Sequence, residues 1–515
     1  MSSPASACGI CGENTWDYLF CIHQSRIFRC RGCGLTVSLA EKDRGSETPS
    51  TDEPVTSATE FDAAREYMDE VQRKHPQAGR MLLIAAPSHP LAAEARARGW
   101  TIMAHLSARE WEMNPVAFPA VDAAVVMFQL EKTNRPLELL RAIRDCLPSR
   151  GPVLLLTQTL DSWACRFFKN SWIGWRRENQ CYWDKHTLQL LLLKSGFGGI
   201  WVCPDRRRYN WAHVVQRAAQ APRTALTRSI ALMNRLLGPF LSPLHLTIAS
   251  SGRKVTCARV EEHSRPLLSI VLPAYNEGQS FPVIMDALLK KDIAGVDREI
   301  IIVESNSRDG TREAVLRYQK QPGVRIILQE GPRGKGNAVR EGFAAAHGDI
   351  LMIQDADLEY DLNDYDALLE PLLKWRQLFV LGARHGGNWK MRQFAEQQGV
   401  AHIMNAGHVI FTTLINILYR QHMRDPFTMY KVIRRDCLFG LDFECSHFDF
   451  DHELVIKLVR KGYRPFELPV NYKSRSYSEG KKVNFFREPL RWLRVDFKCR
   501  FIRLRPPSDF SSLRD

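Results

Sequence analysis

Residues 348–361 read GDILMIQDADLEYD, in which an apolar run is followed at once by acidic side chains. The run from Asp349 to Gln354 predicts a buried strand, and Asp355, Asp357 and Glu359 follow its carboxyl end. Two carboxylates separated by one residue can face a single divalent ion, and such an ion binds a diphosphate well. The stretch therefore predicts a metal-dependent phosphate site at the end of a strand.

Two earlier segments repeat this arrangement of an apolar run that ends in polar side chains. Leu268 to Pro273 is followed by Tyr275 and Glu277, and Glu299 to Val303 is followed by Glu304. In open α/β sheets ligands bind at the carboxyl ends of parallel strands, so the polar clusters are expected to converge on one crevice. The C-terminal half of the chain therefore predicts an α/β domain with one ligand site.

Together these motifs resemble glycosyltransferase family 2, and within it the polyprenyl-phosphate sugar synthases. The segments that carry the resemblance fall in the family's order: SIVLPAYNE, VESNSRDGT, GPRGKGNAVREGFAAAHGDILMIQDADLEYD, LGARH, DPFTMYKVIRR and HFDFDHELVIKLVRKGYRPFELPVNYKSRSYSEGKK. The resemblance implies a GT-A (Rossmann-like nucleotide-sugar) fold with Mg2+ or Mn2+ as cofactor. It also implies inverting transfer of a sugar from a nucleotide-diphosphate sugar to a polyprenyl phosphate or glycan acceptor, as in surface polysaccharide or glycoconjugate synthesis.

The resemblance also implies roles for individual residues. Asp357 would be a catalytic metal ligand, assisted by Glu359. Glu304 stands where the family more often has aspartate, which leaves the nucleobase preference open. An acceptor phosphate would bind Arg475, Lys481 and Lys482 of SRSYSEGKK. The donor would contact Pro273, Tyr275, Glu277, Glu304, Arg333, Lys335, Asp355 and Arg384.

A hydroxyl acceptor would also need a general base, whereas an ionised phosphate acceptor needs none. The candidates are Asp425, Asp449, Asp451 and Glu453, of which Asp451 is favoured. The acids of residues 448–454 would equally suit the start of a helix, where negative charge interacts well with the macrodipole. Both interpretations of this segment stay open at the level of the sequence.

Four cysteines near the start of the chain predict a second kind of metal site. Cys8 and Cys11 form one C-x2-C pair, Cys30 and Cys33 form another, and 18 residues separate the pairs. This spacing is typical of a tetrahedral four-thiolate Zn2+ site. We therefore expect residues 1–40 to form a zinc ribbon whose metal is structural.

Residues 41–60 are rich in Ser, Thr, Pro and charge, which predicts a flexible linker. From residue 61 to residue 264, short apolar runs alternate with helical patterns, as in a doubly wound parallel sheet. The stretch from Phe118 to Ser162 resembles the second half of a class I S-adenosylmethionine-dependent methyltransferase. The preceding ribbon resembles the one that opens certain sugar methyltransferases of that class.

The cofactor pocket of that class depends on a glycine-rich turn after the first strand and on an acidic residue after the second. Here Ala85, Pro87 and His89 stand at the glycine positions, and Leu106 stands near the position of the acid. Proline lacks the N–H donor and leucine cannot accept a hydrogen bond. We therefore expect a degenerate, non-catalytic methyltransferase-like domain. The alternatives are a bifunctional protein with an active sugar methyltransferase, or a scaffold without any activity.

The chain has 515 residues and carries 71 Lys and Arg against 57 Asp and Glu, a net charge of +14 that suggests an anionic partner. Nucleic acid is not expected to be that partner. The sequence shows neither a secretory signal nor an apolar run long enough to cross a bilayer. Its 13 cysteines are too few for a secreted disulfide scaffold. These features predict a cytoplasmic protein, soluble or peripheral on the cytoplasmic membrane face.

The domain expected over residues 265–515 ends in a basic amphipathic segment. Residues 473–505 contain eleven basic and three acidic side chains, and Leu490, Leu493, Phe497 and Phe501 recur at helical spacing. Such a stripe is found both on helices that pack against a domain core and on helices that lie in the interface of an anionic membrane. Both interpretations are retained.

Overall fold

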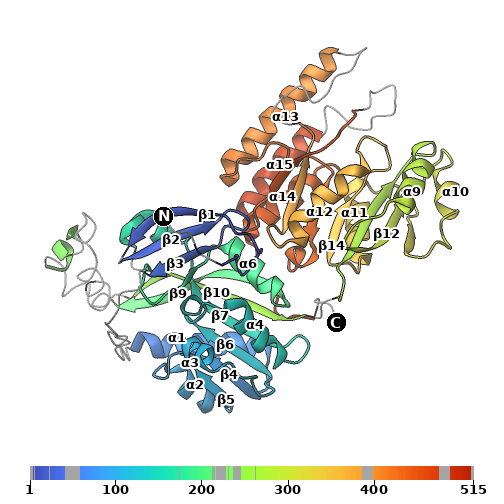
Figure 1. The fold of residues 1–515 in the computed structure, drawn as a ribbon. Helices are drawn as coiled ribbons and strands as arrows, with labels where there is room; N and C mark the ends of the chain where they lie inside the picture. Colours follow the sequence, from blue (N-terminus) through green and yellow to red (C-terminus); the bar gives the residue numbers. More distant parts are fainter. Residues whose placement is uncertain are drawn as a thin grey trace. The chain divides into compact units, whose positions relative to one another are not determined.

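The structure is a computed structural model of the chain. It describes residues 4, 6–22, 24–40, 58–172, 174–210, 215, 228–229, 231–235, 245–260, 263–385, 398–474 and 488–511. The chain forms two compact units: unit 1 comprises residues 1–261 and 507–515, and unit 2 comprises residues 262–506. Both units contain helices and sheets, so the α/β prediction is confirmed (Figure 1).

The cysteine-rich segment of unit 1 forms a small antiparallel sheet. Strands β1 (Trp16–Ile22), β2 (Ser25–Cys30) and β3 (Thr36–Ala40) pair in sequence order, and β3 also pairs with β8 (Cys181–Tyr182). The residues expected to form a separate ribbon therefore share a sheet with a strand from much later in the chain.

The four cysteine sulfurs of this segment lie together. Cys8 Sγ is 3.5 Å from Cys33 Sγ, Cys11 Sγ is 3.5 Å from Cys30 Sγ, and all four lie within 4.8 Å of one another. Tetrahedral Zn–S bonds of about 2.3 Å separate the sulfurs by about 3.8 Å. The cluster is thus compatible with a zinc ribbon.

The main sheet of unit 1 has the order β5-β4-β6-β7-β10-β9. Strands β4 (Arg80–Ile84), β5 (Thr101–Leu106), β6 (Ala123–Met127) and β7 (Pro152–Gln158) are parallel, as the alternating pattern predicts. β9 (Phe197–Asn210) and β10 (His245–Arg259) add an antiparallel pair at one edge. Five described helices of the unit fall between strands: α2 (Leu91–Ala97), α3 (Ala108–Met113), α4 (Pro136–Asp145), α5 (Trp163–Phe168) and α6 (Lys185–Lys194).

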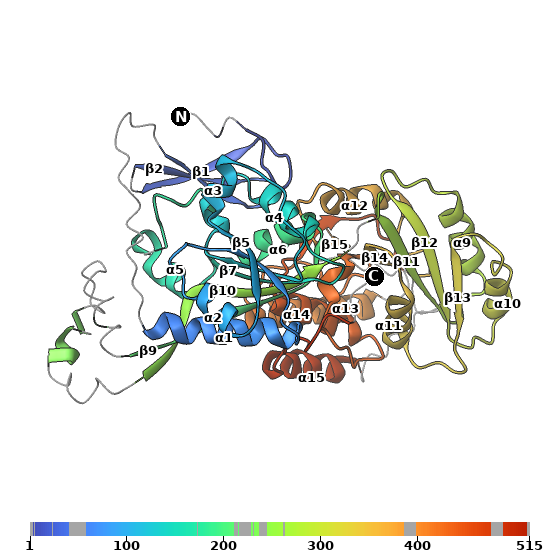
Figure 2. The same ribbon diagram turned by 90° about the horizontal axis from the view of Figure 1, so that it is seen from below.

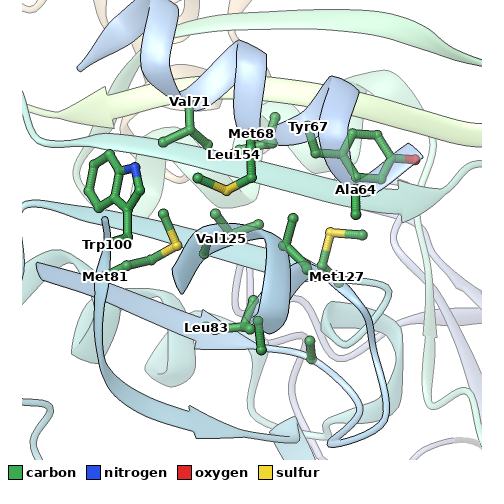
Figure 3. Packing of buried hydrophobic residues seen from close by; sticks show 14 of the residues in the cluster. Ala64, Tyr67, Met68, Val71, Met81, Leu83, Trp100, Val125, Met127 and Leu154 are labelled. Atoms are coloured by element: carbon green, nitrogen blue, oxygen red, sulfur yellow. The ribbon is translucent and has the colours of Figure 1, made fainter. Parts of the chain in front are cut away.

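Helix α1 (Ala58–Lys74) precedes the sheet and covers one face of it. Ala64, Tyr67, Met68 and Val71 of this helix belong to one buried cluster with Leu83, Val125 and Leu154 of three neighbouring strands (Figure 3). Burial of this apolar surface stabilises unit 1. The linker prediction for residues 41–60 concerns mostly residues outside the described ranges, but its last three residues belong to α1.

The turn between β4 and α2 is the place where a methyltransferase would bind its cofactor. Ala85 is fully buried, and its N–H donates to the carbonyl oxygen of Leu106 at 3.0 Å. The Nε2 atom of His105 lies 3.2 Å from the carbonyl oxygen of Ala86. The start of the turn is thus joined to the end of β5. The absence of cofactor binding stays a prediction.

The C-terminal boundary differs from the expected one. Lys74 of α1 donates to the carbonyl oxygen of Pro507 at 2.5 Å, and its ammonium group lies 4.9 Å from the ring centroid of Phe510. Residues 507–515 therefore belong to unit 1, whereas the sequence analysis included them in the transferase domain. A hydrogen bond and a cation–π contact are long-range interactions that the local pattern does not encode.

Unit 2 is built on a seven-stranded sheet of order β13-β12-β11-β14-β16-β15-β17. β11 (Leu267–Ala274), β12 (Asp297–Glu304), β13 (Val324–Leu328) and β14 (Ile350–Ile353) are parallel, and the first three lie side by side in Figure 2. β16 (Lys431–Arg434) runs antiparallel to both β14 and β15 (Phe379–Ala383), and β17 (Phe466–Pro469) closes the edge parallel to β15.

Seven helices of unit 2 are described. Four of them follow β11, β12, β13 and β14 in turn: α9 (Ser280–Lys290), α10 (Thr311–Leu316), α11 (Lys335–Ala345) and α12 (Tyr365–Leu373). The other three, coloured orange to red in Figure 1, pack against one another: α13 (Gln398–Tyr419), α14 (Phe450–Lys461) and α15 (Glu488–Phe501). Gly342 lets α11 approach the sheet closely, because a Cβ atom there would lie 2.3 Å from Val271.

We predict that Cys30→Ser releases zinc from the purified protein, because a four-thiolate site loses one of its ligands. Metal analysis should then show one zinc per chain in the wild type and none in the variant. Hydrogen exchange should rise in residues 6–40 and in β8, with unit 2 unaffected. Cys21→Ser is the matched control, since Cys21 is exposed and lies outside the cluster. Retention of the zinc by Cys30→Ser would refute the site.

Candidate active site

A cavity of about 670 Å³ opens at the carboxyl ends of β11 and β14 in unit 2. Its lining includes Tyr275 and Glu277 after β11, Ser305 after β12, and Asp355 and Asp357 after β14. The polar clusters that follow the three strands therefore converge, as the sequence analysis expects. A volume of this size suits a ligand as large as a nucleotide sugar.

Each of these three turns contains one non-glycine residue in the left-handed region. The φ angles are 49° at Asn276, 55° at Asn306 and 59° at Leu358. Asparagine tolerates this conformation, whereas leucine rarely adopts it. Leu358 stands between Asp357 and Glu359. The least favourable of the three backbone conformations therefore lies in residues 355–359, which we call the acidic turn.

The first carboxylate of the acidic turn is paired with a lysine. Lys335 Nζ lies 2.5 Å from Asp355 Oδ1. Burial alone would lower the pKa of Lys335, but the negative charges of Asp355, Asp451 and Asp357 outweigh it and raise that pKa. Lys335 is the first residue of α11, and it follows Gly334, whose φ of 96° suits only glycine. The predicted contact of Lys335 with donor phosphates is compatible with this place in the cavity.

Asp357 and Glu359, the predicted ligands of a divalent ion, both line the cavity. Glu359 Oε2 accepts a hydrogen bond of 2.8 Å from the hydroxyl of Tyr472. Within the described ranges, only the four cysteines form a set of three or more ligand atoms as close as 4.8 Å. The acidic turn therefore offers one or two carboxylates to an ion. Mg2+ and Mn2+ commonly bind in this way when substrate phosphates supply further ligands.

Arg384 and Asp425 form a buried pair beside the acidic turn. Asp425 accepts from the backbone N–H of Arg384 at 3.0 Å and from its Nε and Nη2 atoms at 2.8 Å each. Burial would raise the pKa of Asp425, but the guanidinium group outweighs it and lowers that pKa far below its ordinary value. Arg384 lines the cavity and Asp425 does not. This geometry favours Asp425 as a residue that positions Arg384 over the predicted role as a base.

Asp451, the favoured candidate base, lines the cavity at the start of α14. Its Oδ1 atom lies 2.9 Å from Nζ of Lys431, which is fully buried in β16. Burial lowers the pKa of Lys431, and Asp451 offsets part of that effect. Asp451 lies in the first turn of a helix and also lines the cavity, so neither interpretation from the sequence excludes the other. Its catalytic role stays a prediction.

Two predicted donor contacts do not line the cavity. Glu304 is fully buried: one carboxylate oxygen accepts from the backbone N–H of Ser307 at 2.7 Å, and the other lies 2.5 Å from Nε of Arg312. The side chain of Arg333 is exposed and lies 3.8 Å from Glu341. The other predicted donor contacts line the cavity, namely Pro273, Tyr275, Glu277, Lys335, Asp355 and Arg384. The predicted acceptor residues Arg475, Lys481 and Lys482 lie outside the described residues.

The sequence analysis missed the apolar half of the cavity. Much of this half comes from α13 and α15, and its lining includes Ile403, Ile410, Phe411, Phe427 and Trp492. His452 also lines it, with its ring stacked on Trp492 and its Nδ1 atom 2.8 Å from Asp496 Oδ1. The apolar spacing of residues 402–418 is a signal that would have revealed α13. Tyr472 also lines the cavity, and no pattern in the sequence around it predicts this position.

Comparison with known proteins assigns unit 2 to a class of enzymes. Residues 269–439 match the family described as Glycosyl transferase family 2. The unit therefore contains a glycosyl transferase family 2 domain, which confirms the family expected from the motifs.

Two of the proteins to which the chain is similar are named dolichyl-phosphate beta-glucosyltransferase. The chain is 27% identical to the dolichyl-phosphate beta-glucosyltransferase of Homo sapiens over 272 residues, which cover 50% of this chain and 81% of the human protein. It is 38% identical to the enzyme of the same name from Drosophila melanogaster over 125 residues, 22% of this chain and 38% of that protein.

The solved structures include glucosyl-3-phosphoglycerate synthase from Mycobacterium tuberculosis in complex with phosphoglyceric acid. It is 22% identical, with a TM-score of 0.33 over 46% of this chain and 81% of that one. Mannosyltransferase PcManGT from Pyrobaculum calidifontis is 21% identical, with a TM-score of 0.30 over 40% and 56% of the two chains.

We predict that Asp425→Asn destabilises unit 2 by about 3–5 kcal/mol at pH 7, because Arg384 is left buried without a counter-charge. The lowered pKa of Asp425 means that its contribution is complete above its ordinary value of 3.8 and is lost as the pH falls through the folded value. The difference from the wild type should therefore be the same at pH 7 and pH 5 and should shrink below about pH 4.

Urea unfolding followed by hydrogen exchange of unit 2 peptides measures this difference. The matched control is Asp366→Asn. Asp366 is an exposed residue paired with Lys291 at 3.1 Å, and loss of this pair should cost less than about 1 kcal/mol. Equal stability of Asp425→Asn and the wild type at pH 7 would show that the buried pair contributes nothing.

Proposed function

We propose that unit 2 is a metal-dependent inverting glycosyltransferase that moves a sugar from a nucleotide-diphosphate sugar to a polyprenyl phosphate. One observation carries this proposal: the acidic turn, Lys335 and Arg384 line a single cavity whose other half is apolar. The charged half suits a donor diphosphate with its metal, and the apolar half suits an acceptor with a hydrocarbon chain.

On the donor side, Asp357 and Glu359 would hold Mg2+ or Mn2+. A bound divalent ion supplies positive charge to the diphosphate that departs in the reaction. Lys335 and Arg384 add fixed cations on the same side of the cavity, and their pairing with carboxylates keeps them in place before a ligand binds. Tyr275 and Glu277, at the end of β11, would contact the nucleoside.

On the acceptor side, the family likeness and the apolar lining favour a lipid phosphate over a glycan. The relatives from Homo sapiens and Drosophila melanogaster are named for a dolichyl-phosphate substrate. A phosphate nucleophile is already ionised at neutral pH, so Asp451 would be free of the base role and would position Lys431 and Lys335. A glycan hydroxyl acceptor, by contrast, would require Asp451 as the base.

We also propose that α13 and α15 dock on an anionic membrane. Ile403, Ile410 and Ile417 recur every seven residues on α13 and are more than half exposed, and Leu490 and Phe501 of α15 are 70% and 79% exposed. α15 packs through Val495, Asp496 and Cys499 instead, so its predicted stripe does not face the core. Basic side chains flank this stripe, as expected for an interfacial helix.

No helix in the described part of the chain is both long enough and apolar enough to cross a bilayer. Docking by α13 and α15 would bring the apolar half of the cavity close to the lipid, because Ile403, Ile410 and Trp492 belong both to these helices and to the lining. A lipid phosphate would then reach the acidic turn without leaving the membrane surface.

The central test is Asp357→Ala. We expect it to abolish sugar transfer and Mn2+-dependent donor binding, because a carboxylate opposite the diphosphate is lost. The assay combines calorimetric titration of UDP-, GDP-, dTDP- and CDP-sugars in Mn2+ with transfer to a short polyprenyl phosphate. Asp366→Ala, on the surface of the same unit and outside the cavity, is the control. Wild-type turnover by Asp357→Ala would place the metal site elsewhere.

A second prediction concerns the membrane. Ile410→Glu combined with Leu490→Glu should reduce co-sedimentation with anionic vesicles at least tenfold, since two charges would enter the interface. Val283→Glu is the matched control, because Val283 is an exposed apolar residue of α9, away from both helices. Unchanged sedimentation of the double variant would exclude this docking surface. Wild-type binding should also weaken as the salt concentration rises.

A further inference from the structure

Tyr472 joins the acidic turn to the strand that closes the sheet of unit 2. It follows β17 by three residues, and it forms an isolated antiparallel bridge with Tyr360. The backbone N–H of Lys473 donates to the carbonyl oxygen of Glu359 at 2.8 Å. The main chain therefore fixes Tyr472 beside the third carboxylate of the turn.

The hydroxyl of Tyr472 acts directly on that carboxylate. It donates to Oε2 of Glu359 at 2.8 Å. Asp355, Asp357 and Glu359 follow one another at every second residue, so three negative charges stand within five residues, and a hydrogen bond or ion pair can fix the orientation of a carboxylate there. Asp355 has Lys335 for this purpose, and Glu359 has Tyr472.

The ring of Tyr472 has a separate contact. The guanidinium carbon of Arg384 lies 5.4 Å from the ring centroid, within the range of a cation–π interaction. Arg384 is itself fixed by its two side-chain hydrogen bonds to Asp425. The ring of Tyr360 lies 5.1 Å away from the ring of Tyr472. The side chain of Tyr472 thus contacts both Glu359, a predicted metal ligand, and Arg384, a predicted donor contact.

We propose that Tyr472 is a positioning residue that sets the metal affinity of the cavity through its hydroxyl and the donor affinity through its ring. The proposal rests on the proposed function of unit 2, in which Glu359 assists a divalent ion and Arg384 faces the donor diphosphate. Groups that orient a ligating carboxylate commonly change metal affinity by tenfold or more when they are removed.

The two contacts can be separated by substitution. Tyr472→Phe removes the hydroxyl and keeps the ring, so Mn2+ affinity should fall about tenfold while UDP affinity at saturating Mn2+ stays unchanged. Tyr472→Leu removes both, so UDP affinity at saturating Mn2+ should also fall. A purely structural role would not produce this split between the two variants.

The measurement is a Mn2+ titration followed by electron paramagnetic resonance, with UDP and with GDP present in separate series, and then calorimetry with the nucleotide at saturating Mn2+. Tyr318→Phe is the matched control. The hydroxyl of Tyr318 donates to Asp286 at 2.7 Å in the same unit, and neither residue lines the cavity. This control should titrate like the wild type.

The outcomes are distinct. If the wild type binds Mn2+ and a nucleotide but Tyr472→Phe titrates like the wild type, the positioning role is wrong and the proposed function stands. If the wild type binds neither Mn2+ nor a nucleotide, the proposed function fails and the role of Tyr472 fails with it. If Tyr472→Phe loses nucleotide affinity at saturating Mn2+ as strongly as Tyr472→Leu does, the assignment of separate roles to hydroxyl and ring is overturned.

Discussion

Three ion pairs in unit 2 fix the charged half of the cavity, and each joins a carboxylate to a cation from another element. They are Lys335–Asp355, Arg384–Asp425 and Lys431–Asp451. A buried charge that loses its partner is strongly unfavourable, so each pair ties its two elements together. The sheet brings these elements near one another, but the pairs determine where the charges lie. The charged groups of the cavity are therefore held in place by ion pairs that form within the protein, before any ligand binds.

This organisation explains why part of the site could be read from the sequence and part could not. The polar residues after β11, β12 and β14 were predictable, because parallel strands bring their carboxyl ends to one edge. The burial of Glu304 against Arg312 was not, because it depends on a side chain eight residues away across a turn. Asp425 was recognised by its motif, but only its contacts with Arg384 distinguish positioning from base chemistry.

The fold was predictable for a related reason. Apolar runs defined most strands of both sheets, and the paired cysteines defined the ribbon segment. The local pattern did not reveal that β3 pairs with β8, nor that Pro507 and Phe510 contact Lys74 of α1. It also left open whether the stripe of α15 faces the core. Periodicity shows that a helix has an apolar face, but it does not show what that face contacts. Long-range pairing decided each of these points.

The return of the last residues to unit 1 has a consequence for biosynthesis. Unit 2 is inserted between the main part of unit 1 and its final segment, so the ribosome makes the transferase before unit 1 is complete. Domains commonly fold as they emerge during synthesis. Unit 1 can form its sheet early, but Lys74 acquires its contacts with Pro507 and Phe510 only after the whole of unit 2 has been synthesised. A chain that stops after residue 506 would thus contain all of unit 2, but its unit 1 would lack the last segment.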